Sequence, residues 1–291
     1  MQYFVSAENS SYFYWQLELL IESFLAQGLE KDLVIGLAGN ESQKIRGFSS
    51  NLVKYGKKFI HTNEGREQGY LPLNRVVAIR YALAKGILKF PFTLIHADML
   101  LRSPIALGES DNDFGVILNN YEEAGEEEKL IKEEIDSSLK SLAEERGVKE
   151  EDLPVLPFFS APVVFNSPFE YISETFFSKV QINMIDIFSR RGASFPCERA
   201  AWELTLAESF QHCSIKGKFM AAPLMFEDEN INFIHYKNGI PPVFHKKFYK
   251  YDEGVYFANQ GPYETMLEHN PTANTNYLHQ LIRSYNRKNN R

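Results

Sequence analysis

The feature that most constrains the fold is a strand–helix–strand pattern at the start of the chain. Residues 3–7 and 32–39 are two short apolar runs of the kind that form buried strands. Between them, apolar residues recur at helical spacing and predict a helix over about 12–28. These residues are Leu17, Leu20, Ile21 and Phe24. Two strands joined by such a helix pair in parallel through a right-handed crossover, so an α/β fold with a mostly parallel sheet is expected.

The same alternation of strands and helices continues along the chain. Further strands are predicted at 57–61, 92–101, 115–119 and within 153–168 and 220–236, and helices at 74–89, 169–190, 197–211 and 277–287. No internal repeat and no clean linker interrupts the pattern. We therefore predict one domain over 1–291, with an acidic helical insertion at about 121–152 and a loop-rich segment from about 237.

Charge and composition exclude several classes of protein. The net charge of −7 argues against nucleic acid as the main partner. Between Glu122 and Asp152 there are 13 acidic and 5 basic residues, a net charge of −8, so the rest of the chain carries +1. The sequence contains no run of 18 apolar residues, so no membrane span is predicted. Two cysteines and no secretion signal at the N-terminus favour a cytoplasmic location with reduced thiols.

The predicted strand over 92–101 carries the most informative short motif. The run is apolar up to Ile95, then reads His96-Ala97-Asp98, then becomes apolar again. Ligands of α/β sheets gather at the carboxyl ends of strands, and residues two apart on a strand face the same way. An imidazole beside a carboxylate suits Mn²⁺ better than Mg²⁺, and such an ion would neutralise a phosphate leaving group. A core histidine beside a turn-capping aspartate is the simpler explanation of this triplet alone.

The surroundings of this triplet resemble a known family. Residues 95–105 resemble the Asp-x-Asp strand of GT-A glycosyltransferases, most of all the plant hydroxyproline O-arabinosyltransferases and the peptidyl-serine galactosyltransferases. Other segments resemble this family in the same order along the chain. These are Tyr14-Trp15-Gln16, Leu73-Asn74-Arg75, Glu198 to Trp202, Ile234-His235-Tyr236 and Phe244 to Tyr249. The resemblance covers about residues 3–120 and 153–250.

The resemblance implies a GT-A fold, a Rossmann-like and mostly parallel sheet flanked by helices, with a metal site at the Asp-x-Asp strand. Asp98 would bind Mn²⁺ or Mg²⁺, with His96 and His235 as further ligands. His96 stands where the family has its first aspartate, which leaves open a metal site that is altered or lost. For His235, a buried histidine bonded to backbone is the alternative.

The resemblance also implies residues for the nucleotide-sugar donor and for catalysis. The end of the first strand would hold the base and ribose through Ser6, Ala7 and Glu8. Cations would meet the diphosphate, namely Arg75 and either Lys246 or Lys247. Glu198 would face the acceptor or the reacting sugar as a catalytic residue, although a carboxylate favoured by the helix dipole explains it equally well.

The predicted function is transfer of a sugar from a nucleotide diphosphate sugar, such as a UDP-sugar, to a hydroxyl of a glycan, peptide or small molecule. The resembled families retain the anomeric configuration, which implies a retaining enzyme. One alternative is an inactive nucleotide- or glycan-binding pseudoenzyme, suggested by His96. A second is a sugar-phosphate nucleotidyltransferase, but residues 6–12 lack the glycine-rich loop that such enzymes carry after the first strand.

Overall fold

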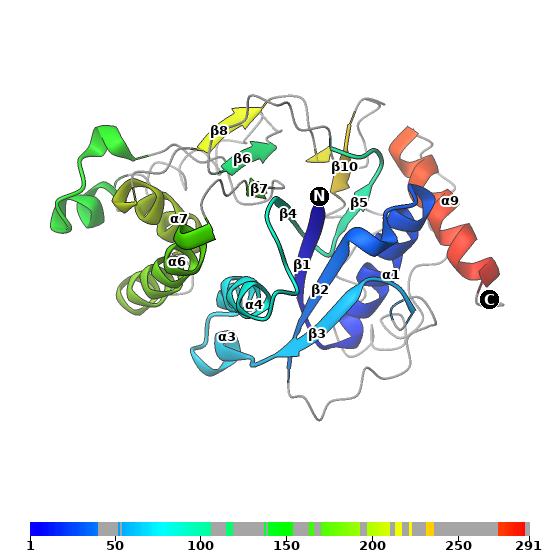
Figure 1. The fold of residues 1–291 in the computed structure, drawn as a ribbon, viewed down its shortest axis with the longest axis horizontal. Coiled ribbons are helices and arrows are strands. Elements are labelled where there is room, and N and C mark those ends of the chain that lie inside the picture. Colours follow the sequence, from blue (N-terminus) through cyan, green and yellow to red (C-terminus); the bar gives the residue numbers. More distant parts are fainter. Residues whose placement is uncertain are drawn as a thin grey trace.

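The centre of the molecule is a seven-stranded sheet with the strand order β3-β2-β1-β4-β7-β6-β8 (Figure 1). Four neighbouring strands, β3 to β4 in that order, are parallel, whereas β7 runs antiparallel to both β4 and β6. The bounds are β1 Gln2–Glu8, β2 Leu33–Ala38, β3 Lys57–His61, β4 Phe92–Ile95, β6 Gly115–Leu118, β7 Val163–Phe165 and β8 Cys213–Lys216. The prediction of a mixed, mostly parallel sheet is confirmed.

This description comes from a computed structural model. It describes residues 1–39, 52, 54–105, 115–118, 137, 139–153, 163–165, 170–192, 197–209, 213–216, 221–222, 231–235 and 273–288. Within these ranges, no helix has both the length and the apolarity needed to cross a membrane.

A second, three-stranded sheet shows that the strand predicted over 92–101 is in fact two strands. The chain leaves β4 after Ile95, turns over 96–98 and enters β5 (Met99–Leu101). β5 belongs to the second sheet, whose strand order is β5-β10-β9. A hydrogen bond from the Met99 N–H to the His96 carbonyl, 3.2 Å long, closes the turn. All three residues of β5 are buried, so the apolar run continues although the strand breaks. β5 pairs antiparallel with β10 (Phe233–His235), and β10 pairs in parallel with β9 (Ala221–Ala222).

Helices cover both faces of the large sheet (Figure 1). On one face α1 (Ser11–Ala26) packs beside α9 (Ala273–Lys288), and on the other α4 (Leu73–Ala84) packs against α6 (Glu170–Arg191), which packs against α7 (Cys197–Glu208). The helix expected over 74–89 ends five residues early. Gly86 adopts φ +64°, a left-handed conformation that ends helices and that glycine takes at no steric cost.

The alternation of side chains along β1 divides the interior into two cores. Tyr3 and Val5 face the core formed with α1, α9 and β5, whereas Phe4 faces the core formed with α4, α6 and α7. The apolar residues predicted for the first helix are fully buried in the first of these cores: Leu17, Leu20, Ile21 and Phe24. The sheet is therefore covered on both sides, as strands that are apolar on both faces require.

The acidic stretch is described only at 137 and from 139 onward, so the predicted helix over 122–136 lies outside the described residues. Its described end carries buried Leu139 and Leu142, which join the second core. Arg146 fixes this end to α6 and α7, because its guanidinium pairs with Asp186 at 2.6 Å and with Glu208 at 3.1 Å. The expectation that this segment packs on the domain is confirmed for that end.

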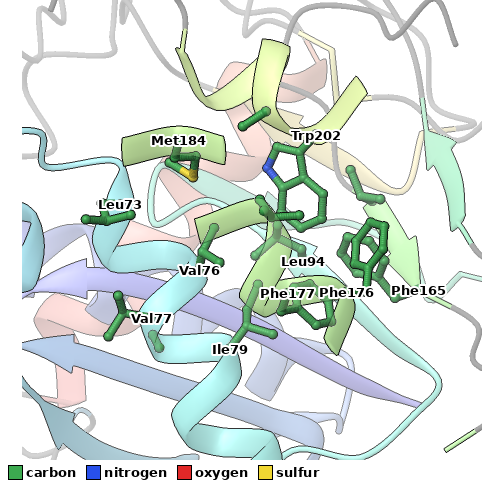
Figure 2. Close-up of a cluster of buried hydrophobic side chains, with 14 of the residues drawn as sticks. Leu73, Val76, Val77, Ile79, Leu94, Phe165, Phe176, Phe177, Met184 and Trp202 are labelled. Carbon is green, nitrogen blue, oxygen red and sulfur yellow. The ribbon is translucent and has the colours of Figure 1, made fainter. Parts of the chain in front are cut away.

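Aromatic rings fill the second core where β7, α6 and α7 meet. Figure 2 shows Trp202 beside three phenylalanines of this cluster. The Trp202 ring stacks on Phe165 with centroids 5.4 Å apart, and it meets Phe177 edge to face at 5.6 Å. Because Trp202 is 1% exposed, its whole ring is excluded from water.

We expect Trp202→Ala to lower the free energy of unfolding by about 3–5 kcal/mol, because it removes a buried ring and leaves a cavity. Urea denaturation followed by circular dichroism measures this loss. The control is Ile182→Ala on α6, whose side chain is 64% exposed and should cost little. A loss equal in the two variants would show that the aromatic cluster does not stabilise the fold.

A buried histidine at the end of β3 makes stability depend on pH. His61 is 3% exposed, its Nδ1 lies 2.9 Å from the Thr62 carbonyl, and its Nε2 has no partner among the described residues. Burial lowers the pKa of His61 to about 4, against an ordinary value of 6.5. As pH falls through 6.5, His61 becomes protonated in the unfolded chain, whereas in the folded chain it stays neutral until about pH 4.

The contribution of His61 is therefore fully present above pH 6.5 and is lost on acidification towards pH 4, by roughly 3 kcal/mol in total. We expect His61→Asn, which keeps a donor for the Thr62 carbonyl, to flatten the pH dependence of the free energy of unfolding in this window. Denaturation of the native chain and the variant at pH 7.5, 6.0 and 4.5 measures this pH dependence. Identical slopes in the two proteins would contradict the assignment.

Candidate active site

A pocket of about 250 Å³ opens where β1 and β4 end. These strands are parallel neighbours, with Val5 opposite Ile95, so the residues that follow them emerge at the same edge of the sheet. The described lining consists of Ser6, Ala7, Glu8, Phe13, Gln16, Leu71, Pro72, Asn74, Arg75, His96, Ala97 and Asp98. Six of the predicted site residues thus line one pocket: Ser6, Ala7, Glu8, Arg75, His96 and Asp98.

The wall opposite β1 is a tight loop held together by Asn74. The Asn74 side-chain oxygen accepts from the Gly65 N–H at 2.8 Å, and its amide donates to the Asn63 side chain at 2.6 Å. Gly65 allows the loop to close, because a Cβ there would lie 2.8 Å from the Tyr70 carbonyl oxygen and 2.9 Å from that of Leu71. This closure places Leu71 and the start of α4 against the pocket.

Arg75 contributes a fixed positive charge to the pocket from the first turn of α4. The backbone N–H groups of residues 73–75 already donate to the carbonyls of Tyr70, Leu71 and Pro72, at 3.0–3.2 Å. The open end of the helix therefore offers few backbone donors to an anion. The charge at this edge comes from the Arg75 side chain, because its guanidinium is always protonated.

Glu198 lies beside Arg75, with Arg75 Nη1 2.8 Å from Glu198 Oε1. The two side chains come from α4 and α7, and both are mostly buried, at 18% and 12% exposed. Burial raises the pKa of Glu198, and the adjacent guanidinium opposes that rise. The Glu198 N–H also donates to the Tyr70 hydroxyl at 2.9 Å, which ties the start of α7 to the loop described above.

The three predicted metal ligands also lie close together. His235, on β10, pairs its Nε2 with Asp98 Oδ1 at 3.2 Å, because β10 runs antiparallel to β5 with His235 opposite Met99. The His96 and His235 rings are 5.7 Å apart, and His96 Nδ1 lies 3.4 Å from Arg75 Nη2. One chain of contacts therefore links five predicted side chains, namely Glu198, Arg75, His96, His235 and Asp98.

As they lie, these donors do not suit a divalent cation. An arginine can only donate, so His96 Nδ1 uses its lone pair on Arg75, and His235 Nε2 faces a carboxylate, for which it must carry a proton. A metal ligand needs a free lone pair, which a neutral His96 bonded in this way no longer has and which His235 keeps only on Nδ1. Within the described residues, no group of three or more His, Cys, Asp or Glu side chains is arranged to hold a metal ion. The expected Mn²⁺ or Mg²⁺ therefore stays a prediction.

Sequence reasoning missed several lining residues. Two predicted site residues, Lys246 and Lys247, fall outside the described residues. Phe13 and Gln16 were not predicted. They could have been, because they are three residues apart on α1, a helix that starts where β1 ends. Asn74, at the start of the helix after a glycine-rich loop, carried a similar signal. Leu71 carried none, since a 48% exposed leucine in a loop has no pattern that marks it.

Comparison with known proteins adds evidence for the fold. No protein-family model and no curated protein matches the sequence. Among solved structures, an active-site mutant of LgtC is similar with a TM-score of 0.51 at 10% identity, over 98% of this chain and 96% of that one. The chain has a GT-A fold.

Two further glycosyltransferases are similar at lower scores. The bifunctional glycosyltransferase WbbM gives a TM-score of 0.46 at 11% identity over 90% of this chain, and this chain spans half of its length. Mouse xyloside xylosyltransferase 1 gives 0.41 at 11% identity, over 82% of this chain and 98% of that one. The likeness to the LgtC mutant confirms the predicted GT-A fold, while its 10% identity leaves the arabinosyl- and galactosyltransferase resemblance a prediction.

The close approach at Gly65 gives a test of how the GT-A pocket is built. We expect Gly65→Ala to lower the free energy of unfolding by about 1–3 kcal/mol, because the new methyl group meets two backbone oxygens that cannot move independently. Urea denaturation measures the change. Glu67→Ala, at an exposed position of the same short helix α3 (Glu64–Glu67), is the control and should change little. Equal stability of Gly65→Ala and the native chain would show that the loop closes differently.

Proposed function

We propose that this protein is a glycosyltransferase that moves a sugar from a nucleotide diphosphate sugar to an acceptor hydroxyl. The observation that carries the proposal is the convergence of Ser6–Glu8, Arg75, His96 and Asp98 on one pocket at the carboxyl edge of a GT-A sheet. In α/β sheets this edge is where ligands bind. The resemblance of the segments around Asp98 and His235 to glycosyltransferase motifs supports the same reaction.

The chemistry of the pocket suits such a donor. The Arg75 guanidinium is planar and can donate two parallel hydrogen bonds to a phosphate. The carboxylates of Glu8 and Asp98 accept hydrogen bonds from sugar or ribose hydroxyls. We propose that Ser6, Ala7 and Glu8 contact the nucleoside and that Arg75 contacts the diphosphate, with a UDP-sugar as the first donor to test.

Glu198 takes a different part from the one expected for a catalytic carboxylate. It already accepts from Arg75 and its side chain is mostly buried, so its first effect is to fix the guanidinium. We propose Glu198 as a positioning residue that holds Arg75 for the diphosphate. We further propose retention of the anomeric configuration, following the resembled families, which proton NMR of the product tests directly.

We expect Asp98→Asn to lower transfer from a UDP-sugar by about 10- to 100-fold, because an amide cannot replace a charged acceptor. Transfer and donor hydrolysis are measured with UDP-glucose, UDP-galactose and UDP-arabinose, each with Mn²⁺ or with EDTA. The matched control is Asp152→Asn, an exposed aspartate in the 3₁₀ turn Glu150–Asp152, which should keep full activity.

Two outcomes would contradict the proposal. Thermal stabilisation by UDP without transfer or hydrolysis of any donor would indicate a nucleotide-binding protein instead of an enzyme. Full activity of Asp98→Asn would remove Asp98 from the site. The EDTA arm tests the metal separately: activity that EDTA abolishes and Mn²⁺ restores would support the predicted cation site.

A further inference from the structure

One side chain in the pocket wall has a hydrogen-bonding group that the described structure leaves unused. Gln16 lies on α1, lines the pocket, and is 0% exposed. Its side-chain Nε2 donates to the Tyr12 carbonyl, one turn earlier on the helix, at 2.8 Å, and its amide also forms a hydrogen bond with the Tyr12 hydroxyl. Its Oε1 is buried and has no hydrogen-bond partner among the described residues.

The orientation of this amide is fixed by its donor. A backbone carbonyl can only accept, so the Gln16 atom that faces Tyr12 must be the nitrogen, and turning the amide over would bring two oxygens together. The oxygen therefore stays on the other side of the amide. Rotation of the side chain cannot satisfy Oε1 without breaking the hydrogen bond to Tyr12.

A buried acceptor without a partner is costly, so proteins rarely keep one without a use. A leucine or methionine would fill the same space on α1 without this cost. Gln16 also sits in the wall of a pocket where a polar ligand is expected, beside the half-buried Phe13.

We propose that Gln16 is a specificity-determining residue whose Oε1 accepts a hydrogen bond from a hydroxyl of the bound donor. This inference rests on the proposed function, because it assigns one contact within the same donor pocket. The hydroxyl comes from the ribose or from the transferred sugar, and both offer the same O–H donor. A ligand that lacks this hydroxyl leaves Oε1 unpaired in the complex, which is how buried polar groups reject close analogues.

The test measures Kd by calorimetry for four ligands: UDP, 2′-deoxy-UDP, 3′-deoxy-UDP and UDP-glucose. We expect the native chain to lose about 10- to 100-fold in affinity when the recognised hydroxyl is absent. In Gln16→Met, which has a similar shape without an acceptor, that ratio should fall close to 1 while the other ratios stay unchanged. A changed ratio for a deoxy-UDP assigns the ribose, and a changed ratio of UDP-glucose to UDP assigns the transferred sugar.

Two controls keep the result interpretable. Gln68→Met, at an exposed glutamine that follows α3, should keep every ratio of the native chain. If Gln16→Met does not fold, Gln16→Asn keeps the amide but withdraws it by one carbon, and the same loss of discrimination is expected. We expect Gln16→Met to be at least as stable as the native chain in urea, because it removes the unpaired acceptor.

Failure of the inference differs from failure of the proposed function. Unchanged ratios in both Gln16 variants, with UDP still bound, would overturn the role of Gln16 and leave the proposed function standing. A marked loss of stability with unchanged ratios would give Gln16 a structural role instead. Absence of binding of all four ligands to the native chain would overturn both.

Discussion

The ion pair between Arg75 and Glu198 joins two parts of the chain that are 123 residues apart, and the geometry of the pocket depends on it. Both partners are mostly buried, so each would be costly alone. A buried pair of this kind is weak evidence for stability, because two apolar residues could fill the same space. Its consequence is orientation: Arg75 can extend towards His96 because a carboxylate of α7 holds its other side.

That ion pair in turn depends on the second core. Glu198 is the second residue of α7, and α7 is held in place by Trp202, which packs against β7 and α6. The Tyr70 hydroxyl, which accepts from the Glu198 N–H, brings the loop before α4 to the same point. Aromatic packing in the second core thus fixes where the Glu198 carboxylate lies, and through it where the Arg75 charge lies.

Local pattern was enough to predict much of the fold. The first strand and β2 follow from short apolar runs, because both faces of a buried strand contact a core. The first helix follows from apolar residues at helical spacing, because only one of its faces contacts a core. The break between β4 and β5 was not visible, since residues 99–101 stay buried after the chain changes sheets. Likewise β8 was missed, because Cys213–Lys216 is a short, mixed-polarity segment whose strand state comes from pairing with β6.

Sequence motifs predicted which residues lie near one another at the candidate site, but not which of them form pairs. Motif order brought Arg75, His96, Asp98, Glu198 and His235 together, and the structure places them in one chain of contacts. Which of these residues pair depends on tertiary geometry. From sequence, Glu198 was predicted to face the acceptor, because no local pattern shows that Arg75 reaches the Glu198 carboxylate. Lining residues such as Leu71 depend on how one loop closes around Asn74, which no periodic pattern records.

The pairing of charges in the pocket has a chemical consequence. Asp98 and Arg75 each contact a protein partner, at 3.2 Å and 2.8 Å, so their positions are set before a ligand arrives. Under the proposed function, the preorganised Arg75 guanidinium would need little rearrangement when negative charge develops on a leaving phosphate, which is why fixed groups stabilise transition states better than mobile ones. The Glu198 carboxylate that fixes Arg75 also weakens the positive field that Arg75 offers to a bound anion. Arg75 is thus held in one orientation with part of its charge offset.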